Sequence, residues 1–211
     1  MTSPAHSVSS SGLDDARDAD IERIGRFFAE CGRRVLTFLG YSDSGYEDPA
    51  AMRVHAERVL DENDPAVTLV NIGATPGGIG AVYELARSRG FMTTGIVSSR
   101  AREQGVALSP FVEVVFFVAD GTWGGLLPGS TTMLSPTSQA IVECSDCFVA
   151  IGGGAVARDE LEAALRAGKP ARFIAAEMNH RAAIAAALKK GLPPPADFRG
   201  AAGERFGTAA L

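Results

Sequence analysis

The sequence is poor in cysteine, tryptophan and histidine, and it has no long apolar run. Three cysteines in 211 residues are too few, and odd in number, for a disulfide framework, which fits a reducing compartment. No stretch approaches the roughly 20 apolar residues that a membrane helix needs. The N-terminal segment also lacks the apolar core of a secretory signal. We therefore expect a cytoplasmic protein that has no membrane partner.

Positive charge is sparse as well. Lysine and arginine total 20 against 25 acidic residues, so the formal net charge is −5, and no five-residue stretch holds more than two basic residues, as at Arg100 and Arg102. Proteins bind nucleic-acid phosphates with clustered Lys and Arg side chains. The sequence therefore predicts no nucleic-acid partner.

Metal and redox motifs are nearly missing. Cys144 and Cys147 form one C-x-x-C, but no second ligand pair accompanies it and the three histidines are scattered. The pair also falls at the end of a predicted helix, whereas a redox pair is expected at a helix start. We expect two small buried residues here and no metal.

Apolar runs alternate with amphipathic stretches along most of the chain. Runs that are apolar throughout indicate strands buried on both faces, and helices between them imply parallel crossovers. We expect one doubly wound, Rossmann-like α/β domain at residues 20–192, with six or more mainly parallel strands, between a disordered tail at 1–19 and an irregular tail at 193–211. The expected strands are 34–40, 66–73, 91–99, 112–120, 147–153 and 171–177, and the expected helices are 21–32, 47–63, 77–90, 136–144, 157–167 and 178–191.

Glycine gathers where two of these strands are followed by helices. In such sheets ligands bind beyond the carboxyl ends of the strands, and the free N–H groups at a helix N-terminus attract an anion. The loops lack the lysine motif of a triphosphate site and the dinucleotide fingerprint, so we expect no cofactor. Close packing of helix on strand is the alternative explanation. The positions expected to line one anion-binding crevice are Gly40, Ser42, Gly73, Thr75, Gly77, Gly78, Gly152, Gly153 and Gly154.

A long loop from Asp120 to Leu134 separates the fourth expected strand from the next helix. Loops of this length in compact domains are usually lids or binding loops. Trp123, the only tryptophan, is a candidate to stack on a base, and Thr131 belongs to a hydroxyl cluster that is a candidate to hold a phosphate. Packing against a neighbouring subunit is an equally good explanation of the loop.

Two segments resemble a known family. The stretch "VTLVNIGATPGGIGAVYELARSRGFMTTGIV" and the later "SDCFVAIGGGAVARDELEAAL" are similar to the LOG-like family, once called lysine decarboxylase-like. That family includes cytokinin-activating phosphoribohydrolases and molybdenum-cofactor carrier proteins. The resemblance covers about residues 34–190 and implies a Rossmann-type fold, a nucleotide or phosphorylated ligand, and a homodimer.

The departures from the family pattern concern the catalytic residues. The family motif P-G-G-x-G-T-x-x-E matches here only at Gly153, Gly154 and Glu160, while the Arg-Lys pair of the family falls on Thr137 and Ser138. Cleavage of an N-glycosidic bond needs an acid at the ribose and a cation for the phosphate. Glu160 supplies the acid, but it is equally explained as an acid in the first turn of its helix.

Two functions remain from this reading. The first is a protein that binds a nucleotide or a phosphorylated cofactor without turning it over, which the missing arginine favours. The second is a nucleoside 5'-monophosphate phosphoribohydrolase that releases a free base and ribose 5-phosphate, with Glu160 as its catalytic residue. We also expect a homodimer, because helix 136–144 and the loop before it carry more apolar residues than a solvated face requires.

Overall fold

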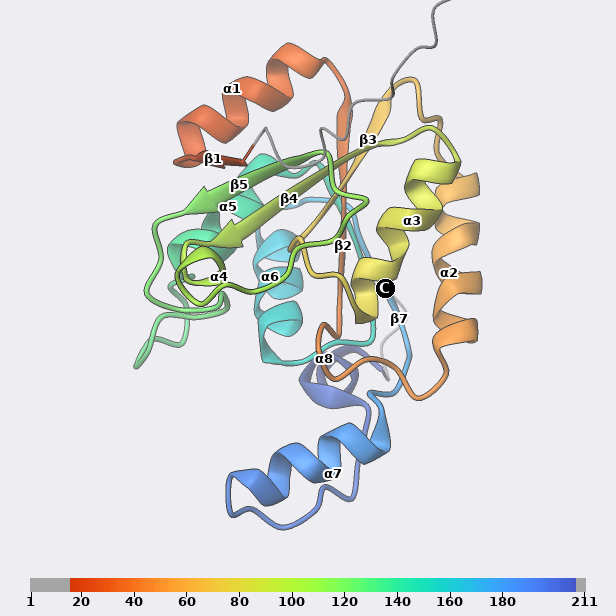
Figure 1. Cartoon of the computed structure of the whole chain (residues 1–211), viewed down its shortest axis with the longest axis vertical. Coiled ribbons are helices and arrows are strands. Elements are labelled where there is room, and N and C mark those ends of the chain that lie inside the picture. The colour runs from red at the N-terminus through yellow and green to blue at the C-terminus, as the bar shows by residue number, and fades with distance from the viewer. Residues whose placement is uncertain (1–15, 208–211) are drawn as a thin grey trace, which may run out of the picture.

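The computed structural model describes residues 16–207, and a single sheet of seven parallel strands forms its centre (Figure 1). The strands follow one another across the sheet in the order β1-β5-β4-β3-β2-β6-β7. The inner strands β3, β5 and β6 are buried along their whole length, as expected for parallel strands between two helical layers. The strand bounds are β1 Ala16–Asp18, β2 Arg34–Gly40, β3 Thr68–Ile72, β4 Met92–Ser98, β5 Val114–Val118, β6 Cys147–Ile151 and β7 Ala171–Ile174.

Helices cover both faces of the sheet and build two hydrophobic clusters (Figure 1). One cluster joins the sheet to α2 (Pro49–Asp61), α3 (Ala81–Ser88) and the short α4 (Arg100–Glu103). The other joins it to α1 (Ile21–Cys31), α5 (Pro136–Cys144), α6 (Ala155–Arg166) and α8 (Gly200–Phe206). A 3₁₀ turn, η1 (Gly78–Gly80), leads into α3, while α7 (His180–Lys189) lies below the other elements in Figure 1. The predicted doubly wound, three-layer α/β fold is confirmed.

Strand order reverses next to β2. From β2 the chain runs outward through β3, β4 and β5, and it then returns to place β6 on the other side of β2. All pairs are parallel, so the loops that follow β2, β3 and β6 leave from the same edge of the sheet. The reversal opens a crevice at this edge, where ligands of doubly wound folds bind.

Both ends of the predicted domain need correction. Residues 16–18, expected within a disordered tail, form β1, which pairs with β5, while residues 1–15 lie outside the described part of the chain. The tail from residue 193, expected to be irregular, contains α8, whose Ala202 and Phe206 are buried. Phe173 of β7 packs beside Phe206 with ring centroids 5.9 Å apart. Packing against the sheet therefore stabilises α8. The sequence did not predict this helix, because its two glycines and two alanines show no periodic pattern of apolar residues.

The apolar residues of α5 pack against other elements of the same chain. Ala140, Ile141 and Val142 are buried, and α5 packs against both α1 and α6. The apolar content from which we expected a dimer interface is thus explained by the core. Homodimerisation stays a prediction that this helix no longer supports.

Candidate ligand-binding site

A cavity of about 550 Å³ lies at the carboxyl edge of the sheet, beside the reversal of strand order. Its wall includes Gly40 and Ser42 after β2, Gly73 and Thr75 after β3, and the first turns of α6. The volume is that of an ordinary small-molecule site. The ends of β2 and β3 and the start of α6 therefore meet at one cavity.

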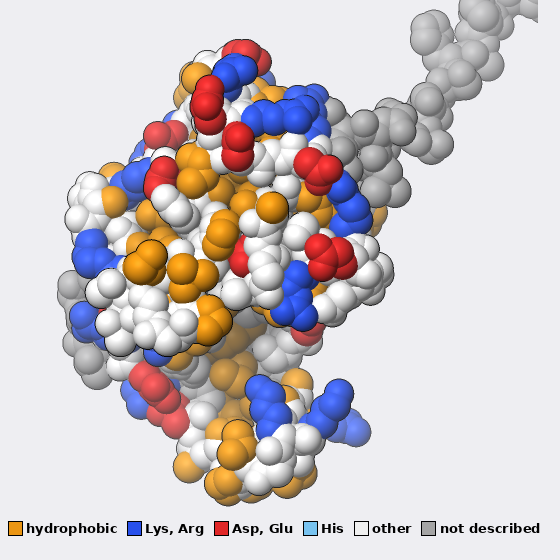
Figure 2. All heavy atoms as spheres, turned by 90° about the vertical axis from the view of Figure 1, so that its left-hand side faces the viewer, with side chains coloured by type: hydrophobic (Ala, Val, Ile, Leu, Met, Phe, Trp, Pro, Cys, Tyr) orange, Lys and Arg blue, Asp and Glu red, His pale blue; other side chains and the backbone are white. Residues whose placement is uncertain are grey.

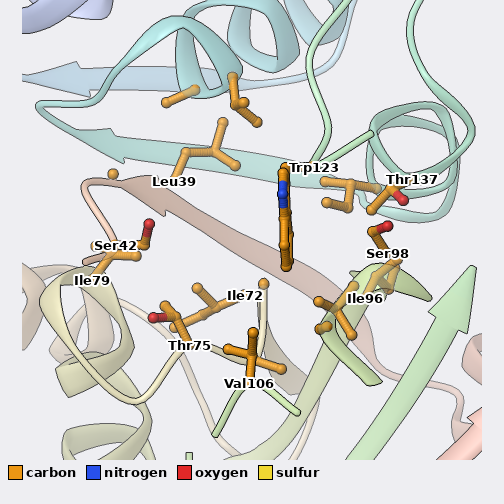
Figure 3. A pocket seen from close by; sticks show the side chains of 18 of the residues that line it. Leu39, Ser42, Ile72, Thr75, Ile79, Ile96, Ser98, Val106, Trp123 and Thr137 are labelled. Carbon is orange, nitrogen blue, oxygen red and sulfur yellow. The ribbon is translucent and has the colours of Figure 1, made fainter. Parts of the chain in front are cut away.

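The interior of the cavity is mainly apolar. Figure 2 faces this side of the molecule and shows hydrophobic side chains gathered across its middle, with charged side chains mostly around them. Figure 3 shows the wall from close by, where Leu39, Ile72, Ile79, Ile96 and Val106 point inward from different elements. Ligand sites of this kind take most of their affinity from apolar contact and their orientation from a few polar groups.

Trp123 stands in the middle of this view with its ring edge-on (Figure 3). Ser42, Thr75 and Ile79 lie toward one face of the indole, and Ser98, Ile96 and Thr137 lie toward the other. The side chain is 47% exposed although it lines the cavity, so much of its surface is free to be covered by a ligand. The Arg100 guanidinium carbon lies 5.5 Å from the ring centroid.

Hydrogen bonds fix the loop that carries Trp123. Arg100 donates to the carbonyl of Gly121 at 2.8 Å on one side of the tryptophan. On the other side, the N–H of Gly125 donates to Ser138 Oγ at 2.7 Å and that of Leu126 to an Asp159 carboxylate oxygen at 3.1 Å. Asp120, at the start of the loop, accepts from the N–H groups of Thr122 and Thr137. The backbone on both sides of Trp123 is therefore held in place before any ligand arrives, which lowers the entropy cost of ordering this loop on binding.

Those hydrogen bonds also determine the charge state of Asp120. Burial raises the pKa of this carboxyl, but the bonds from Thr137 and Thr122 outweigh it and hold the pKa below its usual value. Asp120 is therefore an anion that orders the loop.

Glu160 is the buried acid of the cavity wall. It lies in the middle of α6, is 3% exposed, and accepts a hydrogen bond from Ser138 Oγ at 2.5 Å. Burial raises its pKa to about 7; the bond from Ser138 opposes this shift and neighbouring Asp159 adds to it. The alternative explanation of Glu160 as a first-turn acid is wrong, because α6 begins at Ala155.

Six of the predicted site residues line the cavity and six do not. Gly40, Ser42, Gly73, Thr75, Trp123 and Glu160 line it. The residues outside the lining are Gly77, Gly78, Thr131, Gly152, Gly153 and Gly154. Thr131 lies on the exposed tip of its loop.

The glycine triplet makes room for the chain itself. A Cβ on Gly152 would lie 2.6 Å from the Tyr41 ring and 2.7 Å from the carbonyl oxygen of Ala176. The carbonyl of Gly153 accepts from the N–H of Ala202 in α8 at 3.1 Å. Tyr41 and the C-terminal helix thus occupy the approach that we had expected a ligand to use. The prediction that Gly152 and Gly153 line the crevice is therefore wrong.

Gly78 is a packing position of the same kind. Its φ is +56°, and a Cβ there would meet the backbone carbonyls of Tyr41 and Ser42. The next residue, Ile79, donates its N–H to the Tyr41 carbonyl at 2.7 Å. The loop after β3 is therefore fastened to the loop after β2, which sets the shape of the cavity at this end.

Backbone donors remain near the cavity. The α6 helix begins at Ala155, its N-cap residue Gly154 has no side chain to cap it, and Val156 and Ala157 of its first turn line the cavity. The N–H groups of Thr75 and Gly77 have no acceptor among residues 16–207. Uncapped N–H groups and the positive end of a helix dipole favour an anionic group.

The sequence did not predict that Ser138 forms hydrogen bonds within the site. Ser138 accepts from the Trp123 loop and donates to Glu160, so one hydroxyl joins three elements of the site. The resemblance pointed to this position only as a lost lysine. The apolar side chains Ile96 and Val106 were missed too, because nothing local distinguishes them from core residues.

Neither a cluster of metal ligands nor a membrane-spanning helix is found among residues 16–207. No group of three or more potential ligands is placed to hold a metal ion there. Cys31, Cys144 and Cys147 are free thiols, and burial raises the pKa of Cys144 to about 11. No helix within this range is long and apolar enough to cross a membrane.

Comparison with known proteins finds likeness in structure only. No family model and no curated protein matches the chain. A structural-genomics target described as TM1055 is 21% identical with a TM-score of 0.47, over 65% of this chain and 72% of that one. Two structures of the molybdenum cofactor carrier protein of Chlamydomonas reinhardtii also give TM-scores of 0.47. They are 18% and 19% identical, over 67% and 79% of this chain and 76% and 91% of theirs.

Proposed function

We propose that the chain binds a nucleoside monophosphate, or a phosphorylated small molecule with a flat ring, in the cavity beside Trp123. The observation that carries the proposal is a half-exposed indole, carried on a hydrogen-bonded loop, in the wall of an apolar cavity of about 550 Å³. Bases stack on such rings with about 1–3 kcal/mol each. The uncapped start of α6 and the N–H groups of Thr75 and Gly77 are the candidates to hold one phosphate.

A second function, hydrolysis of the N-glycosidic bond, is favoured by Glu160. A carboxyl with a pKa of about 7 is suited to give and take a proton near neutral pH. Among residues 16–207, however, no lysine, arginine or histidine lines the cavity, and the cation beside it, Arg100, lies against the Trp123 ring. We therefore propose binding first and turnover as the alternative.

Trp123→Ala tests the binding site. Loss of the stacking surface is expected to raise the dissociation constant for AMP or GMP about tenfold, in line with the stacking energy of a single base. Isothermal titration calorimetry measures the change. Phe111→Ala is the matched control, because Phe111 is also a half-exposed aromatic but lies outside the cavity wall, and it is expected to leave the affinity unchanged.

The same samples separate binding from turnover. After incubation with AMP or GMP, chromatography is expected to recover the intact nucleotide. Free base and ribose 5-phosphate that appear with the native chain and not with Glu160→Gln would favour the hydrolase. Equal affinities of the native and Trp123→Ala chains would contradict the proposed site.

A further inference from the structure

The charges of the cavity wall point to the kind of ring that it accepts. Of the residues between 16 and 207 that line the cavity, two are charged, Asp43 and Glu160, and both are acids. A wall with acceptors and no cation favours a ring edge that presents hydrogen-bond donors. It disfavours an edge that presents lone pairs, because these face a carboxylate unfavourably.

Both carboxylate oxygens of Glu160 can accept a further hydrogen bond, because each has two lone pairs. Its Oε1 accepts from Ser138, whereas its Oε2 has no hydrogen-bond partner among residues 16–207. A buried carboxylate that lacks a donor is costly, and this cost appears as the raised pKa of the group. A ligand that brings N–H donors to Glu160 would remove that cost.

The surroundings of Glu160 support no competing partner. The acid beside it, Asp159, is paired with Arg158 at 2.7 Å and also accepts from Leu126. The acid of the Trp123 loop, Asp120, is satisfied by Thr122 and Thr137. Asp43 lies in the loop after β2. Among residues 16–207 only Ser138 donates to Glu160, which leaves Oε2 open to a donor on a ligand.

We propose that Glu160 makes the cavity selective for a guanine-type ring, in which a ring N–H stands next to an exocyclic amino group. A carboxylate accepts such a donor pair as it accepts the fork of an arginine. Adenine presents a lone pair beside its amino group and offers only one donor there. Stacking on Trp123 is tolerant of base identity, so the choice of base falls to Glu160. This inference rests on the proposed nucleotide-binding function.

Calorimetry with GMP, IMP and AMP at pH 8 tests the inference. GMP is expected to bind at least about tenfold more tightly than AMP, as one good donor pair provides. IMP, which keeps the ring N–H but lacks the amino group, is expected to lie between them. Glu160→Gln keeps the size of the side chain but replaces one acceptor by a donor, and it is expected to reduce the preference to about threefold or less.

The outcomes separate the inference from the proposed function. Equal affinities for the three nucleotides, or a guanine preference that survives Glu160→Gln, would overturn the inference and leave nucleotide binding standing. If none of the three nucleotides binds, both the proposed function and the inference are wrong. If the preference for GMP weakens as the pH falls from 8 to 6 while AMP binding does not change, protonation of Glu160 is confirmed as the cause.

Discussion

Replacing Gly152 by alanine is expected to lower the free energy of unfolding by about 3 kcal/mol. Two costs add at this position. The φ of +57° is strained for any residue with a Cβ, and that Cβ would press on the Tyr41 ring at 2.6 Å and the Ala176 carbonyl at 2.7 Å. Neither neighbour is free to move, because the Tyr41 hydroxyl donates to the Arg199 carbonyl at 2.6 Å and also lies 3.2 Å from the Ala176 carbonyl oxygen. Urea denaturation measures the loss.

Gly168→Ala is the matched control for this experiment. Gly168 follows α6 with a φ of +70°, but nothing lies within 4 Å of a Cβ there. Only the backbone strain of about 1 kcal/mol is therefore expected. Equal losses in the two variants would show that the glycine triplet is an ordinary turn and that Tyr41 and α8 do not press on it.

Replacing Glu160 by glutamine is expected to stabilise the chain above pH 7. The folded pKa is about 7 and the ordinary value is 4.5, so the folded state holds the proton more tightly than the unfolded state does. Stability from this group is fully present below pH 4.5 and is lost as the pH rises through 7. At pH 8 the native chain carries a buried charge that costs up to about 3 kcal/mol, and glutamine removes this cost while keeping the acceptor for Ser138.

Denaturation curves at pH 5 and pH 8 measure this effect. The gain from Glu160→Gln is expected to be large at pH 8 and small at pH 5. Glu143→Gln, which removes a charge from the exposed face of α5, is expected to change both values little. A gain that is the same at both pH values would mean that Glu160 is ionised throughout this range, and would contradict the raised pKa.

The strands could be predicted because a strand that is buried on both faces has an apolar residue at nearly every position. Runs such as Val114–Val118 and Cys147–Ile151 are apolar without alternation, and this pattern indicates a parallel sheet before any helix is placed. Helix α2 could be predicted from its first turn, where Asp48 accepts from the N–H of Ala51 and Pro49 opens the helix.

The glycine triplet shows why half of the predicted site residues lie elsewhere. Glycine indicates that something approaches the backbone closely, but it does not say what. At Gly152 and Gly153 the approach is made by Tyr41, 111 positions before Gly152 in the chain, and by α8 near the C-terminus. The contact between Ser138 and Glu160 is equally remote in sequence. Pairings of this kind depend on tertiary packing, which no local pattern records.

Fluorescence of Trp123 during titration with GMP tests the central claim most directly. Trp123 is the only tryptophan of the chain, so any change in indole emission reports on this cavity and on no other surface. We predict a saturable change in emission whose midpoint equals the dissociation constant from calorimetry. Emission that stays constant while calorimetry records saturable binding would place the nucleotide elsewhere and contradict the claim that the cavity beside Trp123 is the site.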